Sequence, residues 1–291
     1  MSLRSMLFVP GDSEKKIAKA VTGHADALIL DIEDSVTPDR KPFARELVAV
    51  TLKAPRRHKL WVRINPLDSE YALDDLAATV GGKPDCILLP KANDAGDVVR
   101  LDRHLTEIEK REGVTPGAIK VVVLANETGA SMFTMGTYAK GAPRLQGITW
   151  GAEDLAAAVG ASSNSDENGE LTMLYKIARA LCLAAAAAAD VDAVDTVYTK
   201  IGDLDGLRKV CNDARRDGFR SKMAIHPEQV AIINDAFTPS PADVAHAKAV
   251  VELFAANPGV GTLKLDGRML DIPHLKQAQR VLALHAQFRK A

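Results

Sequence analysis

Eight short apolar runs alternate with longer segments of helical periodicity, and this alternation is the feature that most restricts the fold. The runs are almost continuously apolar and rich in β-branched residues, which is typical of strands buried on both faces of a parallel sheet. They cover residues 5–10, 27–34, 60–65, 86–91, 120–127, 147–154, 193–198 and 221–227. A strand followed by a helix, eight times, predicts an α/β fold of the TIM (β/α)8 barrel type. A doubly wound open sheet is the structural alternative.

The composition is that of a soluble globular protein, with 47% hydrophobic and 26% charged residues and a net charge of −1. Such a chain has no overall field that attracts nucleic acid or an anionic membrane surface. No apolar run reaches the ~20 uncharged residues of a membrane-spanning helix, and the N-terminus lacks a small-residue cleavage site. Cys86, Cys182 and Cys211 lie far apart within apolar patterns, so we expect reduced core thiols in a cytoplasmic protein. No nucleic-acid or membrane partner is expected.

Polar and charged residues close most of the apolar runs. In a TIM barrel the carboxyl ends of all strands meet on one face, where catalytic groups lie. The polar character of loops explains any single residue of this kind, but a set so rich in acids and bases favours a functional site. Its members are Asp31, Glu33, Asp34, Arg63, Asn65, Lys91, Glu127, Glu153, Asp154 and His226.

Glu127 and Asp154 form the best candidate pair, because they close consecutive runs and their carboxylates are expected to lie close together. The chain has no HExxH or CxxC motif, which gives a zinc site no support. Two carboxylates completed by water and substrate oxygens suit Mg²⁺, or Mn²⁺. A general acid/base pair without metal is the alternative. We prefer the metal, since we expect Arg63 to be the one cation available to a bare carboxylate pair.

Arg63 ends the third run, where an unpaired guanidinium is rare. It either forms a structural salt bridge with Glu33 or Asp34, or binds a substrate carboxylate or an enolate-like oxygen.

After the first run, Pro10 and Gly11 predict a turn and Asp12 a helix cap. Lys15 and Lys19 then share a helix face, which is either a solvated surface or a contact for a phosphate or pyrophosphate. GDSEKK matches no nucleotide-binding motif.

The chain continues beyond the eighth run with a segment that a barrel does not need. A long helix is expected from about Ala242 to Asn257, with Ser240 as its cap. The glycine-rich stretch after it carries Asp266 and Asp271, which predicts either a mobile lid with a reactive acid or a plain β-turn. We therefore expect a catalytic barrel over residues 1–235 and a C-terminal helical lid segment over residues 236–291.

Short motifs along nearly the whole chain resemble those of the aldolase/citrate lyase family, in its citrate lyase β-subunit-like and malyl-CoA or citramalyl-CoA lyase branch. They occur in the family's order and approximate spacing. The motifs are RSMLFVPG, ALILDIEDSV, VRIN, LLPK, NETG, GAEDLAAAVG, GF followed by IHPEQ, INDAFTPS and GRMLDIPHLKQAQR.

The resemblance implies a Mg²⁺-dependent carbon–carbon lyase on a TIM barrel. Its substrate would be a 3-hydroxy-dicarboxyl acyl-CoA thioester such as malyl-CoA, and its products an α-keto acid and an acetyl-CoA-type thioester. It also implies a homo-oligomer, a trimer or hexamer, in which the lid segment packs on a neighbouring subunit. A citrate lyase β subunit acting on an acyl-carrier-protein thioester, a malyl-CoA thioesterase and a non-catalytic barrel are the alternatives.

The resemblance also implies roles for individual residues. Glu127 and Asp154 match the magnesium ligands, and Arg63 matches the arginine that holds the oxygen where charge develops. Asp271 matches an acid that the lid delivers to a neighbouring subunit's site. The remaining matches are coenzyme A contacts at Phe8, Lys15 and Lys19 and thioester contacts at Ile225 and His226. From their places at the strand ends we expect supporting acids at Glu33, Asp34 and Glu153.

Overall fold

A computed structural model, which describes residues 3–288, shows a closed barrel of eight parallel strands in sequence order. Each strand pairs with the next along the chain, and β1 closes the ring against β8. The predicted TIM barrel is therefore confirmed, and the open-sheet alternative is wrong. The strands are β1 Ser5–Pro10, β2 Ala27–Asp31, β3 Lys59–Arg63, β4 Cys86–Leu89, β5 Lys120–Ala125, β6 Leu145–Trp150, β7 Asp192–Asp195 and β8 Ser221–Ala224.

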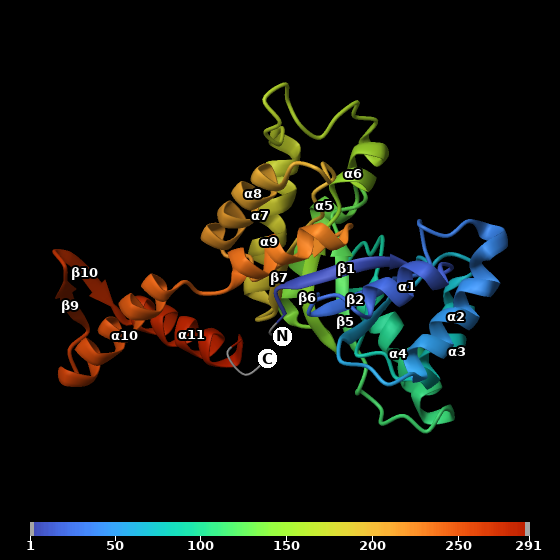
Figure 1. Cartoon of the computed structure of the whole chain (residues 1–291), viewed down its shortest axis with the longest axis horizontal. Helices are drawn as coiled ribbons and strands as arrows, with labels where there is room; N and C mark the ends of the chain where they lie inside the picture. Colours follow the sequence, from blue (N-terminus) through green and yellow to red (C-terminus); the bar gives the residue numbers. More distant parts are fainter. Residues whose placement is uncertain (1–2, 289–291) are drawn as a thin grey trace. The chain divides into compact units, whose positions relative to one another are not determined.

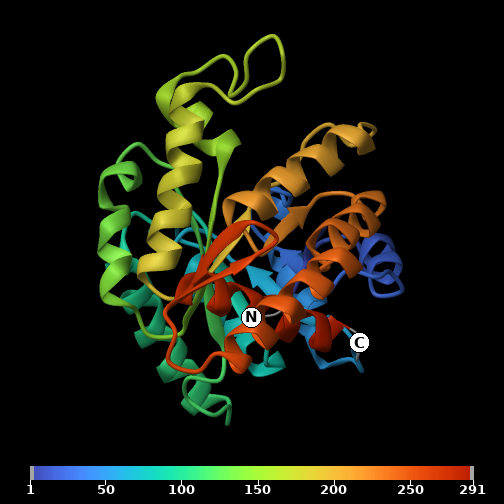
Figure 2. The same cartoon turned by 90° about the vertical axis from the view of Figure 1, so that its left-hand side faces the viewer.

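Helices surround these strands and connect each one to the next (Figure 1, Figure 2). The α-helices up to the last strand are α1 Glu14–Ala20, α2 Lys41–Lys53, α3 Ala72–Thr79, α4 Ala95–Arg111, α5 Ser131–Thr134, α6 Ala152–Val159, α7 Met173–Ala188 and α8 Leu204–Asp217. Short 3₁₀ helices occur at η1 Pro38–Arg40, η2 Val80–Gly82 and η3 Met135–Lys140.

Every second side chain along the strands points into the barrel. These inward-facing side chains fill its interior, and the same alternation positions the first residues of the site. Ala27 and Ile29 on β2 and Trp61 on β3 belong to the buried cluster inside the barrel. Side chains two residues apart on a strand point to the same side. Asp31 and Arg63 therefore continue the inward-facing rows of β2 and β3, and the two are register partners across the strands. The barrel thus brings a carboxylate and a guanidinium together at the carboxyl ends of its strands.

The chain divides into two compact units, the first covering Leu3–Ile233 and the second beginning at Asn234. Helix α9 Pro227–Phe237 runs across this division. The second unit contains α10 Pro241–Ala256, the antiparallel strands β9 Thr262–Leu265 and β10 Arg268–Asp271, and α11 Ile272–Phe288. Its own core is formed by Ala247, Val250, Phe254, Leu270 and Ala278.

Capping residues fix two helix starts, one as expected and one not. Ser240 caps α10 in a capping box with Asp243, which confirms the prediction for that helix. The expectation for α1 was wrong, because its N-cap is Ser13, whose hydroxyl accepts from Lys16 N–H, and not Asp12.

In the glycine-rich stretch Asp266 and Gly267 have positive φ values of 47° and 79°. They form the two-residue turn of the β9–β10 hairpin, so at this point the plain turn is what the chain adopts.

All three cysteines are buried free thiols, as expected. Burial raises the pKa of Cys211 to about 11 and that of Cys86 and Cys182 further still. Such thiols form little of the reactive thiolate near neutral pH. Among residues 3–288 no helix is both long and apolar enough to cross a membrane.

A buried ion pair joins Glu109, near the end of α4, to Arg144, which directly precedes β6. Arg144 is 3% exposed and donates 2.8 Å hydrogen bonds from Nη1 and Nη2 to the two carboxylate oxygens of fully buried Glu109. Glu109 also accepts from Gly117 N–H at 2.8 Å and Ile119 N–H at 3.1 Å. A buried carboxylate is tolerated here because charge and hydrogen bonds compensate for its lost hydration.

We expect Arg144→Met to lower the free energy of unfolding by about 3–5 kcal/mol, because Glu109 stays buried without its bidentate partner. Urea denaturation followed by circular dichroism measures the loss. Arg111→Met is the matched control, since it removes an arginine that is 60% exposed and pairs with Glu112. Its expected change is below about 1 kcal/mol. Equally small changes in both variants would contradict the stabilising role of the Glu109–Arg144 pair.

Candidate active site

A cavity of about 640 Å³ lies within the first unit and is lined by the residues at the carboxyl ends of the strands. This volume is within the range of small-molecule sites. Charged side chains from several strand ends share it with apolar side chains of the barrel interior. The lining includes Phe8, Asp31, Arg63, Glu127, Glu153, Asp154, Ile225 and His226, together with Lys16 and Lys19 of α1 and the apolar Leu124, Val197, Ile201 and Met223.

Asp31 and Arg63 form a bidentate ion pair across β2 and β3. Arg63 Nε and Nη2 each donate to one oxygen of Asp31 at 2.7 Å. The same carboxylate accepts from Glu33 N–H at 3.0 Å and Ser35 N–H at 3.3 Å, so it also holds the loop that follows β2. Burial raises the pKa of Asp31, but the charge and hydrogen bonds of Arg63 outweigh it and keep that pKa below its ordinary value. Asp31 is therefore an ionised anchor.

Arg63 has a second acid and an aromatic ring beside it. Its Nη1 lies 2.9 Å from Glu33 Oε2, and its guanidinium carbon lies 4.9 Å from the centre of the Phe8 ring. Glu33 Oε2 accepts no hydrogen bond from any residue in 3–288, so this contact is an ion pair, and the two hydrogen bonds to Asp31 leave N–H groups on both Nη nitrogens. Arg63 thus forms the expected salt bridge with Glu33 while keeping donors for a ligand in the cavity it lines. Its strongest partner, Asp31, was not anticipated.

Glu127 is held in place by unusual backbone geometry around it. It follows Asn126, which has a φ of +54° and whose amide donates to Ala178 O at 2.8 Å. Glu127 Oε2 accepts from the backbone N–H of Lys91 at 2.5 Å, while buried Oε1 accepts no hydrogen bond from any residue in 3–288. Burial and then the charge of Asp154 raise the pKa of Glu127 well above its ordinary value. A bound cation would relieve both effects.

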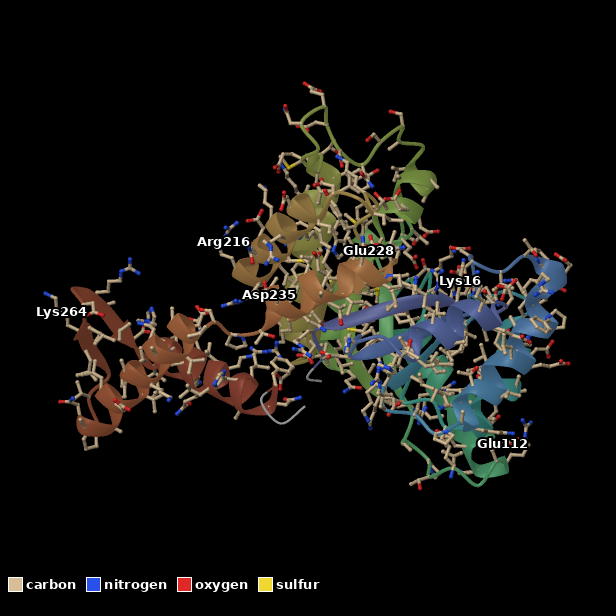
Figure 3. The ribbon with its side chains drawn as sticks, in the orientation of Figure 1. Lys16, Glu112, Arg216, Glu228, Asp235 and Lys264 are labelled. Carbon is tan, nitrogen blue, oxygen red and sulfur yellow. The ribbon has the colours of Figure 1, made fainter. Side chains whose placement is uncertain are left out.

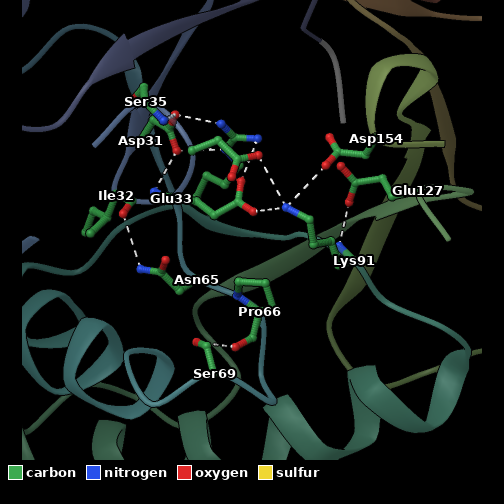
Figure 4. A network of polar contacts seen from close by, with 12 residues as sticks. Asp31, Ile32, Glu33, Ser35, Asn65, Pro66, Ser69, Lys91, Glu127 and Asp154 are labelled. Atoms are coloured by element: carbon green, nitrogen blue, oxygen red, sulfur yellow. Dashed lines mark hydrogen bonds and ion pairs between the residues drawn. The ribbon is translucent and has the colours of Figure 1, made fainter. Parts of the chain in front are cut away.

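Asp154 and Glu153 occupy the first turn of α6 rather than the end of β6. The partial positive charge of a helix N-terminus stabilises carboxylates in this turn. Asp154 points toward Glu127 (Figure 4), whereas Glu153 accepts from Asn164 in the loop after α6 at 2.9 Å. The two adjacent acids therefore differ in position. Asp154 joins Glu127, and Glu153 is at the margin of the cavity.

Lys91 lies among these carboxylates, although the sequence suggested no role for it beyond its place at a strand end. Its ammonium contacts Glu33 Oε1 and lies 3.3 Å from both Asp34 Oδ2 and Asp154 Oδ1. Its φ of +51° is uncommon for a lysine and costs on the order of 1–3 kcal/mol. The expectation that Arg63 alone supplies a cation to the acids is therefore wrong. A lysine at the end of a buried strand was the signal in the sequence, but only the barrel register shows which acids surround it.

The residues present fit a magnesium ion better than a metal held by protein ligands alone. Within residues 3–288 no group of three or more histidine, cysteine or acidic side chains is placed to hold a metal. Glu127 and Asp154 instead supply a pair of oxygen ligands, one of them the orphaned Glu127 Oε1. Mg²⁺ usually keeps several waters and binds through one or two carboxylates plus substrate oxygens.

The expected coenzyme A contacts are only partly at the cavity. Phe8, Lys19, Ile225 and His226 line it, and so does Lys16, which is labelled in Figure 3; Lys15 is not among the lining residues. The residue that positions Ile225 and His226 was not predicted. Buried Gln229 accepts from both of their backbone N–H groups, at 2.9 and 3.2 Å.

Asp271 belongs to the second unit, at the end of β10, and its carboxylate contacts the imidazole of His274. Its place in the site therefore stays a prediction.

Glu33 and Asp34 lie in the loop after β2, where Asp34 is largely exposed and pairs with Lys91.

We expect Gly151→Ala to weaken magnesium binding at least about tenfold, which is the loss typical of a metal site whose ligand is no longer held in position. A β-carbon at residue 151 would lie 2.7 Å from Glu127 Cγ, so Glu127 must move. Isothermal titration calorimetry with MgCl₂ measures the effect. Gly129→Ala is the control, because a β-carbon there meets no atom within 4 Å. Unchanged affinity in Gly151→Ala would contradict the role of Glu127 as a ligand.

Comparison with known proteins agrees with this geometry. The model of the HpcH/HpaI aldolase/citrate lyase family matches residues 4–227. The chain is 36% identical over 283 residues to the citrate lyase subunit beta of Haemophilus influenzae, covering 96% of this chain and 95% of that protein. It is 35% identical over 285 residues to a (3S)-malyl-CoA thioesterase of Cereibacter sphaeroides, covering 96% and 93%.

A solved structure is similar over the same length. The crystal structure of CitE from Mycobacterium tuberculosis, in complex with magnesium, acetoacetate and coenzyme A, has a TM-score of 0.81 and 30% identity. The match covers 98% of both chains. The chain therefore belongs to the HpcH/HpaI aldolase/citrate lyase family and is an enzyme of the carbon–carbon lyase type.

Proposed function

We propose that this protein is a Mg²⁺-dependent lyase that cleaves a 3-hydroxy-dicarboxyl acyl-CoA thioester, such as malyl-CoA or citramalyl-CoA. The products are an α-keto acid and an acetyl-CoA-type thioester, and the reverse reaction is a condensation. The observation that carries the proposal is one cavity lined by the Glu127–Asp154 pair, Arg63, and Lys16 and Lys19 of α1. The similar crystal structure that contains magnesium, acetoacetate and coenzyme A supports the same ligands.

Glu127 and Asp154 would hold the magnesium ion, which would supply Lewis-acid polarisation of the carboxylate and hydroxyl oxygens of the substrate. Mn²⁺ prefers the same oxygen ligands and is the natural substitute. The orphaned Glu127 Oε1 and the half-buried Asp154 supply the negative charge that such an ion requires. The remaining steps are carried by the side chains of the protein.

Arg63 stabilises the oxygen on which negative charge develops. Its two hydrogen bonds to Asp31 leave N–H groups on both Nη nitrogens available to a ligand. The two acids fix the guanidinium before the substrate arrives, and a preorganised donor of this kind needs no rearrangement during the reaction. The hydroxyl proton would pass to solvent water, the electron pair of the O–H bond would form the keto group, and the pair of the broken carbon–carbon bond would leave the thioester fragment as an enolate.

Asp271 would protonate the enolate carbon in the lyase direction and act as the base in condensation. We propose that it reaches the site from the C-terminal lid segment, residues 236–291, of a neighbouring subunit in a trimer or hexamer. Lys15, Lys16 and Lys19 would approach the phosphates of coenzyme A, with Phe8, Ile225 and His226 near the thioester. Glu33, Asp34 and Glu153 would support the charged centre.

Two related activities are separated from this proposal by their products. A thioesterase releases free thiol, and a citrate lyase β subunit prefers a citryl thioester on an acyl-carrier protein. The malyl-CoA thioesterase of Cereibacter sphaeroides makes the first comparison necessary, since it matches along nearly the whole chain. Keto acid and free thiol must therefore be measured separately.

With Mg²⁺ and a panel of malyl-, citramalyl- and citryl-CoA, we expect keto acid without free thiol from at least one substrate. Glu127→Ala should abolish this turnover, because the metal pair loses one ligand. Glu107→Ala, which removes an exposed acid of α4, is the control and should keep wild-type turnover. Free thiol without keto acid would replace the lyase proposal by a thioesterase.

Asp271→Asn should also abolish lyase turnover while leaving Mg²⁺ affinity unchanged, since an amide cannot protonate the enolate. Asp266→Asn is the control in the same hairpin, because asparagine tolerates the positive φ of that turn. Mixing Glu127→Ala and Asp271→Asn subunits should restore partial activity if the acid comes from a neighbour. Full activity of Asp271→Asn would remove the lid acid from the mechanism.

A further inference from the structure

Lys91 contacts both proposed metal ligands at once, through different atoms. Its backbone N–H donates to Glu127 Oε2 at 2.5 Å, and its ammonium lies 3.3 Å from Asp154 Oδ1. The ammonium also contacts Glu33, which is only 3% exposed. Figure 4 shows this side chain between the acids that follow β2 and those that follow β5 and β6. One residue at the end of β4 thus spans the whole cluster.

The charge balance gives the ammonium a specific task. Four carboxylates, Glu33, Asp34, Glu127 and Asp154, lie around Lys91, whereas Arg63 is engaged by Asp31 and Glu33 on its other side. Among residues 3–288 the ion pairs of Asp154 involve Lys91 alone. The ammonium therefore compensates the charge of the proposed metal pair in the free protein.

The same ammonium opposes a divalent cation at this position. A positive charge a few ångströms away repels Mg²⁺, and the Asp154 oxygen near Nζ is one that a metal would use. Glu33 is not a proposed metal ligand, and its contact with the ammonium holds the Lys91 side chain in place. The left-handed backbone of Lys91 is what turns its N–H toward Glu127, so the side chain and the backbone act on different ligands.

We propose that Lys91 is a positioning residue and internal counter-cation that orients Glu127 and Asp154 and lowers the affinity of this pair for Mg²⁺. The inference rests on the proposed magnesium site. Its consequence is that the free enzyme binds the ion weakly and binds it better once an anionic substrate adds negative charge. Metal and acidic substrate then bind cooperatively, with Lys91 setting the size of the effect.

Calorimetric titration of the substrate-free protein with MgCl₂ tests the inference. Lys91→Met and Lys91→Gly both remove the ammonium and keep the N–H, so both should bind Mg²⁺ at least about fivefold more tightly than wild type. Lys91→Arg keeps the charge and should stay within about twofold. A general loss of structure would weaken binding, so a gain in affinity is specific to the lost charge.

Lys83 provides the matched control, because it is also a lysine with left-handed backbone, at a φ of +57° after η2. Lys83→Met and Lys83→Gly should leave the affinity for Mg²⁺ unchanged. Unchanged or weaker binding in both Lys91→Met and Lys91→Gly, with wild type binding normally and both variants melting cooperatively, would overturn this inference alone. Absence of Mg²⁺ binding in wild type itself would overturn the proposed function.

Discussion

Compensation of buried negative charge at the mouth of the barrel is the constraint on which the rest of the site depends. Closing eight parallel strands brings their carboxyl ends together, and here those ends carry acids from β2, β5 and α6. Isolated carboxylates in so dry a place would take up protons instead of staying charged. Arg63 prevents this for Asp31, whose pKa stays below its ordinary value, and Lys91 forms an ion pair with the partly exposed Asp154. Glu127 keeps one oxygen without a partner among residues 3–288.

The backbone contributes to this arrangement at a cost in stability. Lys91 and Asn126, at the ends of neighbouring strands, both have positive φ values, and Gly151 leaves room for the Glu127 side chain. Strained residues of this kind persist only where the surrounding structure holds them, and they concentrate at functional sites. Asn126 is tied to α7 through Ala178 O, and Lys91 to the acids. The strain therefore fixes one orientation of the proposed metal ligands.

The barrel itself was predictable from the sequence because its evidence is local and repeated. Continuous apolar runs and helical periodicity survive in the sequence whatever the detailed packing, and the polar ends of those runs pointed to Arg63, Glu127 and Asp154. What the sequence could not supply was register. The dominance of Asp31 over Asp34 as partner of Arg63 follows from pairing across β2 and β3.

Other misses have the same physical origin. The N-cap of α1 is Ser13 and not Asp12, and Lys16 rather than Lys15 lines the cavity. The central position of Lys91 depends on the three-dimensional closure of the barrel, which no spacing along the chain reveals. The place proposed for Asp271, in the site of a neighbouring subunit, stays a prediction, because neither a local sequence pattern nor a single chain contains such a contact.

We propose above all that Glu127 and Asp154 together hold the divalent cation. A crystal structure of the wild-type protein soaked in MnCl₂, with anomalous data that locate manganese, tests it most directly. We expect one strong anomalous peak within bonding distance of Glu127 Oε1 and an Asp154 oxygen. A peak beside Asp31 or Glu33, with none between Glu127 and Asp154, would contradict it.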